Sequence, residues 1–371
     1  TYPTSLTDNI SPNGQDAGNP QVAMDDNGNA VIVWDQYDGS NEQIFKSEYH
    51  NGKWTNPSLV DNISPNGQDA QNPQVAMDNN GNAVIVWNQY DGLNDQIFKS
   101  EYRNGKWTNP KSLTDNISPN GQGADSQQVA MDNNGNTVIV WRQSDGSNQQ
   151  IFKSEYRNGK WANPSLADNI SSLAGQNTKH PQVAMDDNGN AVIVWDQYDG
   201  SNQQIFKSEY RKGTWTNPSS HYDNISQTGQ DAWNPQVAMD NNGNAVIVWN
   251  QSDGSYGQIF KSEYRNGKWT NPSLADNISP GGQNAEHPHV AMDDNGNAVI
   301  VWRQSDGLND QIFKSEYRNG TWTNPSLADN ISPGGQDALH PHVAMDNNGN
   351  AVIAWRQSVG SYPQIFKSEY R

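Results

Sequence analysis

The sequence contains no cysteine, which excludes a disulfide framework, a thiol nucleophile and a cysteine-ligated metal. It is also poor in positive charge, with 23 basic against 41 acidic residues and a net charge of −18. An acidic surface repels phosphate groups, so we expect neither nucleic acid nor an anionic membrane as a partner.

Long apolar runs are missing as well. The longest are short pieces such as residues 30–34, far below the roughly 18 residues of a membrane span. No signal-peptide pattern is present, and the chain opens on Thr1 rather than Met, which favours a processed or excised form. We expect an extracellular or cell-surface protein without a membrane span and without a cofactor.

Only 32% of the residues are hydrophobic, a fraction that by itself suggests disorder. The 14 Trp and 14 Tyr indicate a folded chain instead, because disordered segments are poor in aromatic residues. At 371 residues the chain is longer than most domains with one core, so several domains or a repeat architecture are expected.

One unit is repeated seven times along the chain. The string Val-Ala-Met-Asp recurs with its methionine at 24, 77, 131, 185, 239, 292 and 345. The string Ile-Phe-Lys-Ser-Glu-Tyr recurs with its tyrosine at 49, 102, 156, 210, 264, 317 and 370. A fixed period of this kind is the signature of a repeat fold.

Within a unit the apolar pattern has the period of β-strands, and no helical pattern is present. In the first copy we expect strands over residues 21–24, 30–36, 43–49 and from 54 to about 63. Residues 25–29 and 51–52 read as tight turns. Four antiparallel strands per unit predict an all-β fold, a seven-bladed β-propeller that forms one domain over residues 1–371.

Residues 1–11 resemble residues 108–118, which belong to a fourth strand. The seventh unit stops at Arg371, before its own fourth strand. We therefore expect residues 1–10 to form the outer strand of the last blade and to close the ring, which leaves no open sheet edge.

The copies differ most at two positions, which the fold does not fix, and a third position holds Tyr in three units and Ser in four. The first precedes the Asn-Pro or His-Pro pair, and the second follows the Trp of the second strand. The first holds Gly18, Gln71, Asp125, Lys179, Trp233, Glu286 and Leu339. The second holds Asp35, Asn88, Arg142, Asp196, Asn250, Arg303 and Arg356. Both adjoin loops that leave one end of a blade, so that loop face is the predicted binding surface; neutral drift at exposed loops is the alternative.

The candidate ligand-binding residues lie in these loops, where Gln36 and Asp38 would bond hydroxyl groups, Tyr37 would stack and Asn19 would assist. The equivalents in the other units are Asn72, Gln89, Tyr90, Asp91, Gln143, Asp145, His180, Gln197, Tyr198, Asp199, Asn234, Gln251, Asp253, His287, Gln304, Asp306, His340 and Gln357. Val359 replaces the aspartate in the last unit, so its site should be the weakest.

Metal chemistry has two candidates. His287, His289, His340 and His342 form two His-Pro-His strings in neighbouring units and could hold a transition metal. The favoured explanation is that histidine replaces the Asn or Gln of the other units and keeps a hydrogen-bonding side chain at these positions. The turn at residues 25–29 resembles a calcium loop but lacks its distal acidic ligand, so a tight turn is expected there.

Catalysis requires unlike groups at one place, and repeats that match residue for residue do not supply them. Glu286 is a glutamate that the other units lack, but the residue type at the equivalent position differs in every unit. Lys46 and Glu48 share one strand face and could offer a carboxylate to a sugar, although a same-strand ion pair is favoured. From these observations we expect that the chain is not an enzyme.

Residues 19–34, with Asp25, Gly28 and Trp34, resemble the repeats of bacterial sialidase-like propellers. In the Asp-box turns of that family an Asp and a Gly precede a Trp that packs between blades. The resemblance covers every unit and implies the fold. The spacing Ser-x-Asp-x-Gly-x-x-Trp is not kept, and the arginine triad and tyrosine–glutamate pair of sialidases match no position, so sialidase activity is not implied. The nearly identical repeats also resemble recently amplified propellers, and the architecture is similar to that of propeller lectins, which bind sugars between blades.

These features predict a multivalent carbohydrate-binding propeller with a shallow site at each blade boundary, whose partners are glycans. The alternative is a scaffold without catalytic activity that docks a protein partner on the loop face. Trp233, Leu339, Leu93 and Leu308 would favour that alternative if they formed one patch. A duplication product without a selected ligand is the third hypothesis.

Overall fold

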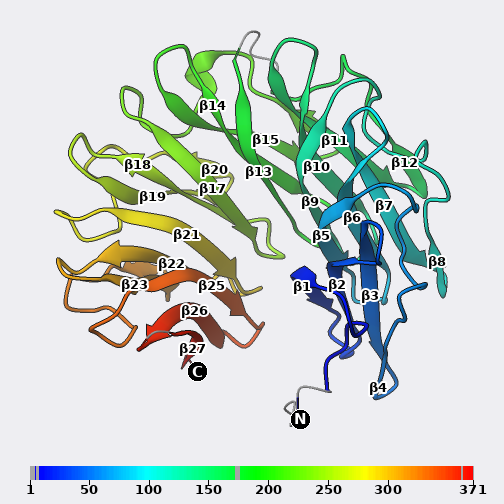
Figure 1. Ribbon diagram of the computed structural model, residues 1–371. Coiled ribbons are helices and arrows are strands. Elements are labelled where there is room, and N and C mark those ends of the chain that lie inside the picture. The colour runs from blue at the N-terminus through cyan, green and yellow to red at the C-terminus, as the bar shows by residue number, and fades with distance from the viewer. Residues whose placement is uncertain (1–4, 6–7, 172–175, 361, 371) are drawn as a thin grey trace. The chain divides into compact units, whose positions relative to one another are not determined.

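Seven consecutive antiparallel sheets make up the protein, which confirms the predicted all-β class and the seven-bladed β-propeller arrangement (Figure 1). The computed structural model describes residues 5, 8–171, 176–360 and 362–370. The chain divides into two compact units, residues 1–170 and 171–371. Blades 1 to 3 lie in the first unit and blades 4 to 7 in the second.

Every blade runs up and down in chain order, so each strand pairs with the next one. In the first unit the strands are β1 (Ala17–Met24), β2 (Ala30–Tyr37), β3 (Glu42–His50) and β4 (Lys53–Thr55); β5 (Ala70–Met77), β6 (Ala83–Tyr90), β7 (Asp95–Arg103) and β8 (Lys106–Thr108); β9 (Ala124–Met131), β10 (Thr137–Ser144), β11 (Gln149–Arg157) and β12 (Lys160–Ala162).

The second unit repeats the same order of strands. They are β13 (Thr178–Met185), β14 (Ala191–Tyr198), β15 (Gln203–Arg211) and β16 (Thr214–Thr216); β17 (Ala232–Met239), β18 (Ala245–Ser252), β19 (Gly257–Arg265) and β20 (Lys268–Thr270); β21 (Ala285–Met292), β22 (Ala298–Ser305), β23 (Asp310–Arg318) and β24 (Thr321–Thr323); β25 (Ala338–Met345), β26 (Ala351–Val359) and β27 (Tyr362–Tyr370). The described residues contain one helical element, the 3-10 turn η1 (His221–Asp223), and no helix among them is long and apolar enough to cross a membrane.

The first strand of each blade is longer than predicted and contains a β-bulge. In β1 the pairing with β2 shifts between Gly18 and Gln21. Asn19, inside the shift, has a left-handed backbone with φ of 48°. Asn tolerates this conformation better than most residues, which explains why an Asn recurs at the bulge.

The fourth strand is shorter than predicted. The expected strand from Trp54 to about Ile63 is wrong, because β4 ends at Thr55. Pro57 follows closely and has no N–H to donate. The Asp61 carboxylate accepts the backbone N–H of Ser58 at 2.8 Å and turns the chain. Pairing is resumed by one hydrogen bond, from Ile63 N to Ile44 O at 2.8 Å.

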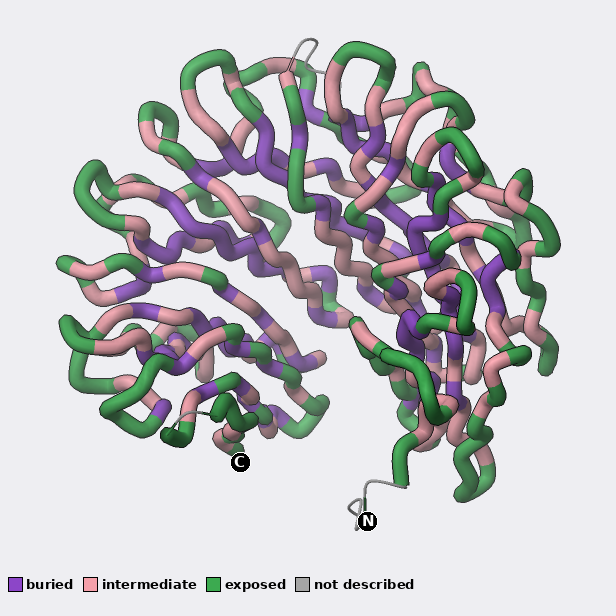
Figure 2. The backbone as a smooth tube through the Cα atoms, in the orientation of Figure 1, coloured by how far each residue is buried: buried purple, intermediate pink, exposed green. Residues whose placement is uncertain are grey.

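The hydrophobic core lies between consecutive blades of a unit. The second strand is buried on both faces, as predicted, and appears as purple bands in Figure 2. Val31, Val33 and Ile44 of blade 1 pack against Trp87 and Phe98 of blade 2. Inside blade 2 the rings of Trp87 and Phe98 stack with centroids 6.2 Å apart. Each blade therefore buries its apolar faces only when a neighbour covers them.

The predicted closure of the ring rests on residues 1–10, and residues 1–4 and 6–7 lie outside the described part of the chain. Among the described residues β27 pairs only with β26, so the last sheet has three strands. Closure and the single domain over residues 1–371 remain predictions.

Candidate functional site

The loops of the predicted loop face do lie together. The loop at 38–41 joins β2 to β3, and the connection at 56–69 leads from β4 to the next blade. Asp69 Oδ1 accepts the backbone N–H of Glu42 at 3.0 Å and the Asn41 amide at 3.2 Å. Both loops are thus at the same end of the strands, as the sequence predicts.

The predicted glutamines are buried and bonded within the blade. Gln36 is 1% exposed; its Oε1 accepts Trp34 Nε1–H at 3.0 Å, and its Nε2 donates to Pro12 O at 2.7 Å. Equivalent bonds join the tryptophan and glutamine of every other blade, at Gln89, Gln143, Gln197, Gln251, Gln304 and Gln357. Each amide oxygen is therefore occupied by the indole, and the glutamine connects the core to the loop above it.

The predicted aspartates shape their own loops. Asp38 Oδ1 accepts the N–H groups of Ser40 at 2.7 Å and Asn41 at 2.9 Å. The same turn recurs at Asp91, Asp145, Asp199, Asp253 and Asp306. In blade 7 Val359 cannot form it, and β26 continues through Val359 to pair with Tyr362. The neighbouring Tyr37, Tyr90 and Tyr198 are 39–40% exposed.

The Asn19 position is the bulge residue of each blade. Its equivalents with a positive φ are Asn72, Ser126, His180, Asn234, His287 and His340. Asn19 Nδ2 donates to Asp35 Oδ2 at 2.8 Å, and His180 Nδ1 lies 2.7 Å from Asp196 Oδ1. These side chains therefore contact the strand beside them.

The four histidines of the proposed metal site form two facing pairs. The His287 and His340 rings are 6.0 Å apart, and the His289 and His342 rings are 4.8 Å apart. Burial and the neighbouring His342 lower the pKa of His289 to about 4. Within the described part of the chain no three His, Cys, Asp or Glu residues are placed to share a metal ion.

The turn that resembles a calcium loop is closed by its own side chains. Asp25 Oδ1 accepts Asn29 N–H at 2.7 Å, and Asp25 Oδ2 accepts Asn29 Nδ2 at 2.6 Å. Gly28 has φ of 83°, as expected for a tight turn.

The apolar residues of the alternative scaffold hypothesis differ in exposure. Leu93 and Leu308 are 81% and 90% exposed at loop tips, whereas Trp233 in β17 and Leu339 in β25 are partly buried. Docking of a protein partner remains a prediction.

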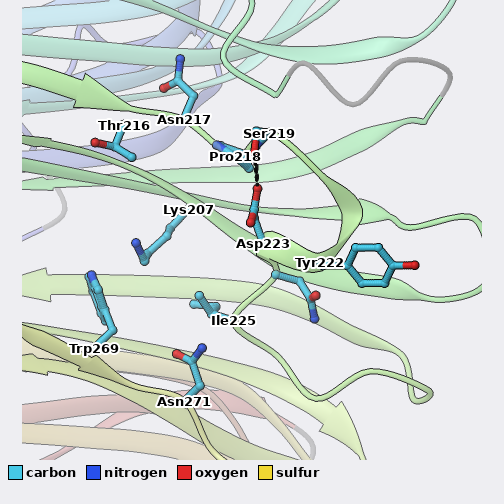
Figure 3. A pocket seen from close by; sticks show the side chains of 11 residues that line it. Lys207, Thr216, Asn217, Pro218, Ser219, Tyr222, Asp223, Ile225, Trp269 and Asn271 are labelled. Atoms are coloured by element: carbon cyan, nitrogen blue, oxygen red, sulfur yellow. Dashed lines mark hydrogen bonds between the residues drawn. The ribbon is translucent and has the colours of Figure 1, made fainter.

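The structure adds clefts at the boundaries between consecutive blades. The cleft between blades 4 and 5 has a volume of about 430 Å³ (Figure 3). The cleft is lined by Lys207 of β15, Thr216 at the end of β16, Asn217, Pro218, Ser219, Tyr222 and Asp223 of the connection that follows, and Trp269 and Asn271 of blade 5. The next boundary has an equivalent cleft of about 410 Å³, with Lys261, Thr270, Asn271, Asp276 and Trp322.

Two residues that line the cleft between blades 4 and 5, Lys207 and Trp269, belong to a charged and aromatic cluster around Glu209. Lys207 Nζ lies 4.9 Å from the Trp269 ring centroid and 2.8 Å from Glu209. Trp269 Nε1 donates to Glu209 at 3.2 Å. Burial acts to raise the pKa of Glu209, but Lys207, Arg211 and Trp269 together hold it below its ordinary value.

The contact between lysine and tryptophan is found at three further boundaries. A lysine lies over the next blade's tryptophan in the pairs Lys46–Trp107, Lys99–Trp161 and Lys261–Trp322. The favoured interpretation of the Lys46 and Glu48 pattern, a same-strand ion pair, is therefore confirmed. The sequence reasoning did not identify the clefts, although a Trp followed by Thr-Asn-Pro or Ala-Asn-Pro recurs in six copies and could have indicated them.

Comparisons with known proteins find the same fold in solved structures. No protein-family model and no curated protein matches the chain. Among solved structures, an ulvan lyase of polysaccharide lyase family PL25 matches 96% of this chain and 94% of its own at 12% identity, with a TM-score of 0.56. Another structure of that lyase is bound to a GlcA–Rha3S unit.

Two further structures are less similar. The microbial sialidase Hz136 matches 88% of this chain and 73% of its own at 12% identity, with a TM-score of 0.45. The six-bladed fucose-binding lectin of Aleuria aurantia matches 85% of this chain and 98% of its own at 13% identity, with a TM-score of 0.42.

The prediction that the chain is not an enzyme is contradicted by these comparisons. The ulvan lyase has the same fold over nearly the whole length of this chain. The repetition of the blades favoured a protein without catalytic activity, but the same fold occurs in a lyase and therefore does not exclude catalysis.

Proposed function

We propose that the protein binds carbohydrate, and that an extended glycan lies across the clefts between consecutive blades. The observation that carries this proposal is the recurrence of one cleft, with the same kinds of lining residue, at adjacent boundaries. Amides, hydroxyl groups and the edge of an indole suit the hydroxyl groups and apolar C–H faces of sugars. The carbohydrate-active proteins of the same fold support it.

The charges in the clefts favour neutral over acidic sugars. Lys207 is paired with Glu209, so its charge is compensated. Asp223 and Asp276 add carboxylates to the two cleft rims, and Ser219 and Ser273, respectively, hold their pKa values below the ordinary range. The whole chain carries a net charge of −18. We expect uronates and sulfated sugars to be repelled.

Adjacent clefts could act together on one ligand. Asn271 lines both the cleft between blades 4 and 5 and the cleft between blades 5 and 6. A glycan long enough to occupy both would gain roughly 10²–10⁴ in avidity over a single contact. Multivalent binding of this kind would suit an extracellular protein that meets polymeric glycans.

The test is a screen of the full chain against neutral and acidic glycans. Asn271→Ala removes a lining amide from two clefts and should weaken binding of the best polymer by about tenfold. Lys268→Ala is the matched control, because Lys268 is exposed on the same hairpin and lines neither cleft. A folded protein that binds no glycan, or that binds equally well after Asn271→Ala, would contradict the proposal.

The same screen tests for cleavage. Bound polysaccharides are incubated with the chain, and their length is followed by size-exclusion chromatography. Shortening of the polymer would add a catalytic role to binding.

The loop face is the second candidate location, because Tyr37, Tyr90 and Tyr198 expose 39–40% of their surface beside the aspartate turns. Other blades hold Ser at this position, so Tyr90→Ser is a change that the fold already tolerates. Loss of glycan binding in Tyr90→Ser but not in Asn271→Ala would place the site on the loop face.

A further inference from the structure

At the first boundary a residue that is otherwise constant is replaced. The residue after the repeated Lys-Ser-Glu-Tyr string is His50 in the first copy and Arg in the other six. His50 ends β3, and the turn of the next blade, residues 78–82, lies against it.

At four other boundaries the arginine contacts the next blade. Arg211 Nε donates to Glu209 at 2.9 Å, and its Nη1 donates to Gly243 O at 3.0 Å. Its guanidinium carbon lies 3.7 Å from the Tyr264 ring centroid. Arg103, Arg265 and Arg318 also lie over the tyrosine of the next blade. The carbonyls of Gly296 and Gly349 accept from Arg265 and Arg318.

At the first boundary the space of the guanidinium is open. A Cβ built on Gly135 would meet Arg103 Nη1 at 2.9 Å, whereas a Cβ on the equivalent Gly81 would meet only Asp25 Oδ2, at 3.8 Å. A cavity of about 470 Å³ lies here, lined by Asn29, His50, Asn80, Gly81, Asn82, Tyr102, Asn104 and Gly105. His50 stays at its edge, with Nδ1 3.0 Å from Asn29 Oδ1 and its ring 6.2 Å from Tyr102.

The partners of a guanidinium are still present. Tyr102 corresponds to Tyr264 and Gly81 to Gly243. Glu48, which corresponds to Glu209, is held by Lys46 and lies 3.5 Å from His50 Nε2. Tyr102 and Gly81 line the cavity directly, whereas Glu48 lies behind His50 and does not line it. Carboxylate, tyrosine face and glycine carbonyl are together the contacts that a planar cation makes at the other boundaries.

We propose that the cavity beside His50 is a binding site for a guanidinium group, carried by free arginine or by an arginine side chain of a peptide. The ligand's guanidinium takes the place that Arg211 occupies at its own boundary, between the Tyr102 ring and Gly81. The remaining volume, walled by asparagine amides, accommodates the rest of the ligand. This site is independent of the carbohydrate clefts, because it is lined by none of their residues.

Isothermal titration of the full chain with L-arginine, N-acetyl-arginine amide, citrulline and lysine tests the proposal. We expect one binding site for at least one arginine form. Citrulline, which lacks the charge, and lysine, which lacks the planar guanidinium, should bind at least about tenfold more weakly. Binding of the amide form indicates a peptide ligand, and binding of free arginine alone indicates the amino acid.

Two variants make the test sharp. His50→Arg fills the cavity from within, as Arg103, Arg211, Arg265 and Arg318 fill the space at their boundaries, and should abolish binding in a protein at least as stable as the parent. Arg265→His opens an equivalent cavity and should raise the stoichiometry from one site to two. Equal binding of citrulline, no binding of either arginine form, or unchanged binding in His50→Arg would overturn the proposal. A melting curve confirms that each variant is folded.

Discussion

Arg142 donates two hydrogen bonds to Asp125, its register partner across the strands, from Nε at 2.8 Å and from Nη2 at 2.6 Å. The two variable positions of the repeat are register partners across the first two strands of every blade, and in blade 3 they form an ion pair. Arg303 pairs with Glu286, and Lys179 lies opposite Asp196. Blades 3 and 6 thus carry an ion pair at the variable positions, whereas Gly18, Trp233 and Leu339 face their register partners without one. We predict that the two residues of such an ion pair are energetically coupled.

Asp125→Gln alone should destabilise the protein by about 0.5–1 kcal/mol, since the ion pair is partly exposed. The double variant Asp125→Gln with Arg142→Asn installs the pair found in blade 2, Gln71 and Asn88. It should recover most of the loss, which urea unfolding of the two single variants and the double variant would measure. Strictly additive losses would show that the two positions are not coupled.

Gln89→Leu should cost about 2–4 kcal/mol, because it leaves buried Trp87 Nε1 and Pro65 O without partners. Denaturant unfolding measures the loss. Tyr90→Ser, at the next residue but exposed, is the control and should stay near the parent. A stable Gln89→Leu protein would contradict the structural role of the glutamine.

The strands and the loop face could be predicted from the sequence because period-2 patterns and turn residues are local. The sequence could not predict which polar side chains bond within the fold and which are free for a ligand. Gln36 and Asp38 carry groups that suit a ligand, but Gln36 bonds Trp34 and Asp38 bonds Ser40 and Asn41. The cleft was not predicted because it depends on Trp269 packing on Lys207, which lies 62 residues earlier in the chain.

The histidine pair should make stability fall in mild acid. The pKa of His289 is lowered from 6.5 to about 4, first by burial and then by His342. The unfolded chain takes up a proton below pH 6.5, whereas the folded one does so only near pH 4. Stability is therefore complete above pH 6.5 and is lost as the pH falls toward 4, by on the order of 1–3 kcal/mol.

The matched variant for this prediction is His289→Gln, since Gln occupies this position in five other blades. Melting temperatures between pH 7 and pH 4 should fall less steeply in His289→Gln than in the parent. Identical slopes would show that His289 does not titrate in the way its surroundings imply.

Lys207→Met separates charge from packing in the cleft between blades 4 and 5. The methionine keeps an apolar stem over Trp269 but leaves Glu209 with Arg211 and Trp269 as its remaining partners. Because Lys207 helps to lower the pKa of Glu209, that pKa should rise in the variant and stability should fall by about 1 kcal/mol at neutral pH. Binding of neutral glycans should change little, since the ammonium is already compensated by Glu209. Lys212→Met, in the exposed hairpin turn of the same blade, is the control for the lost charge. A large loss of neutral-glycan binding in Lys207→Met alone would mean that the ammonium itself contacts the sugar.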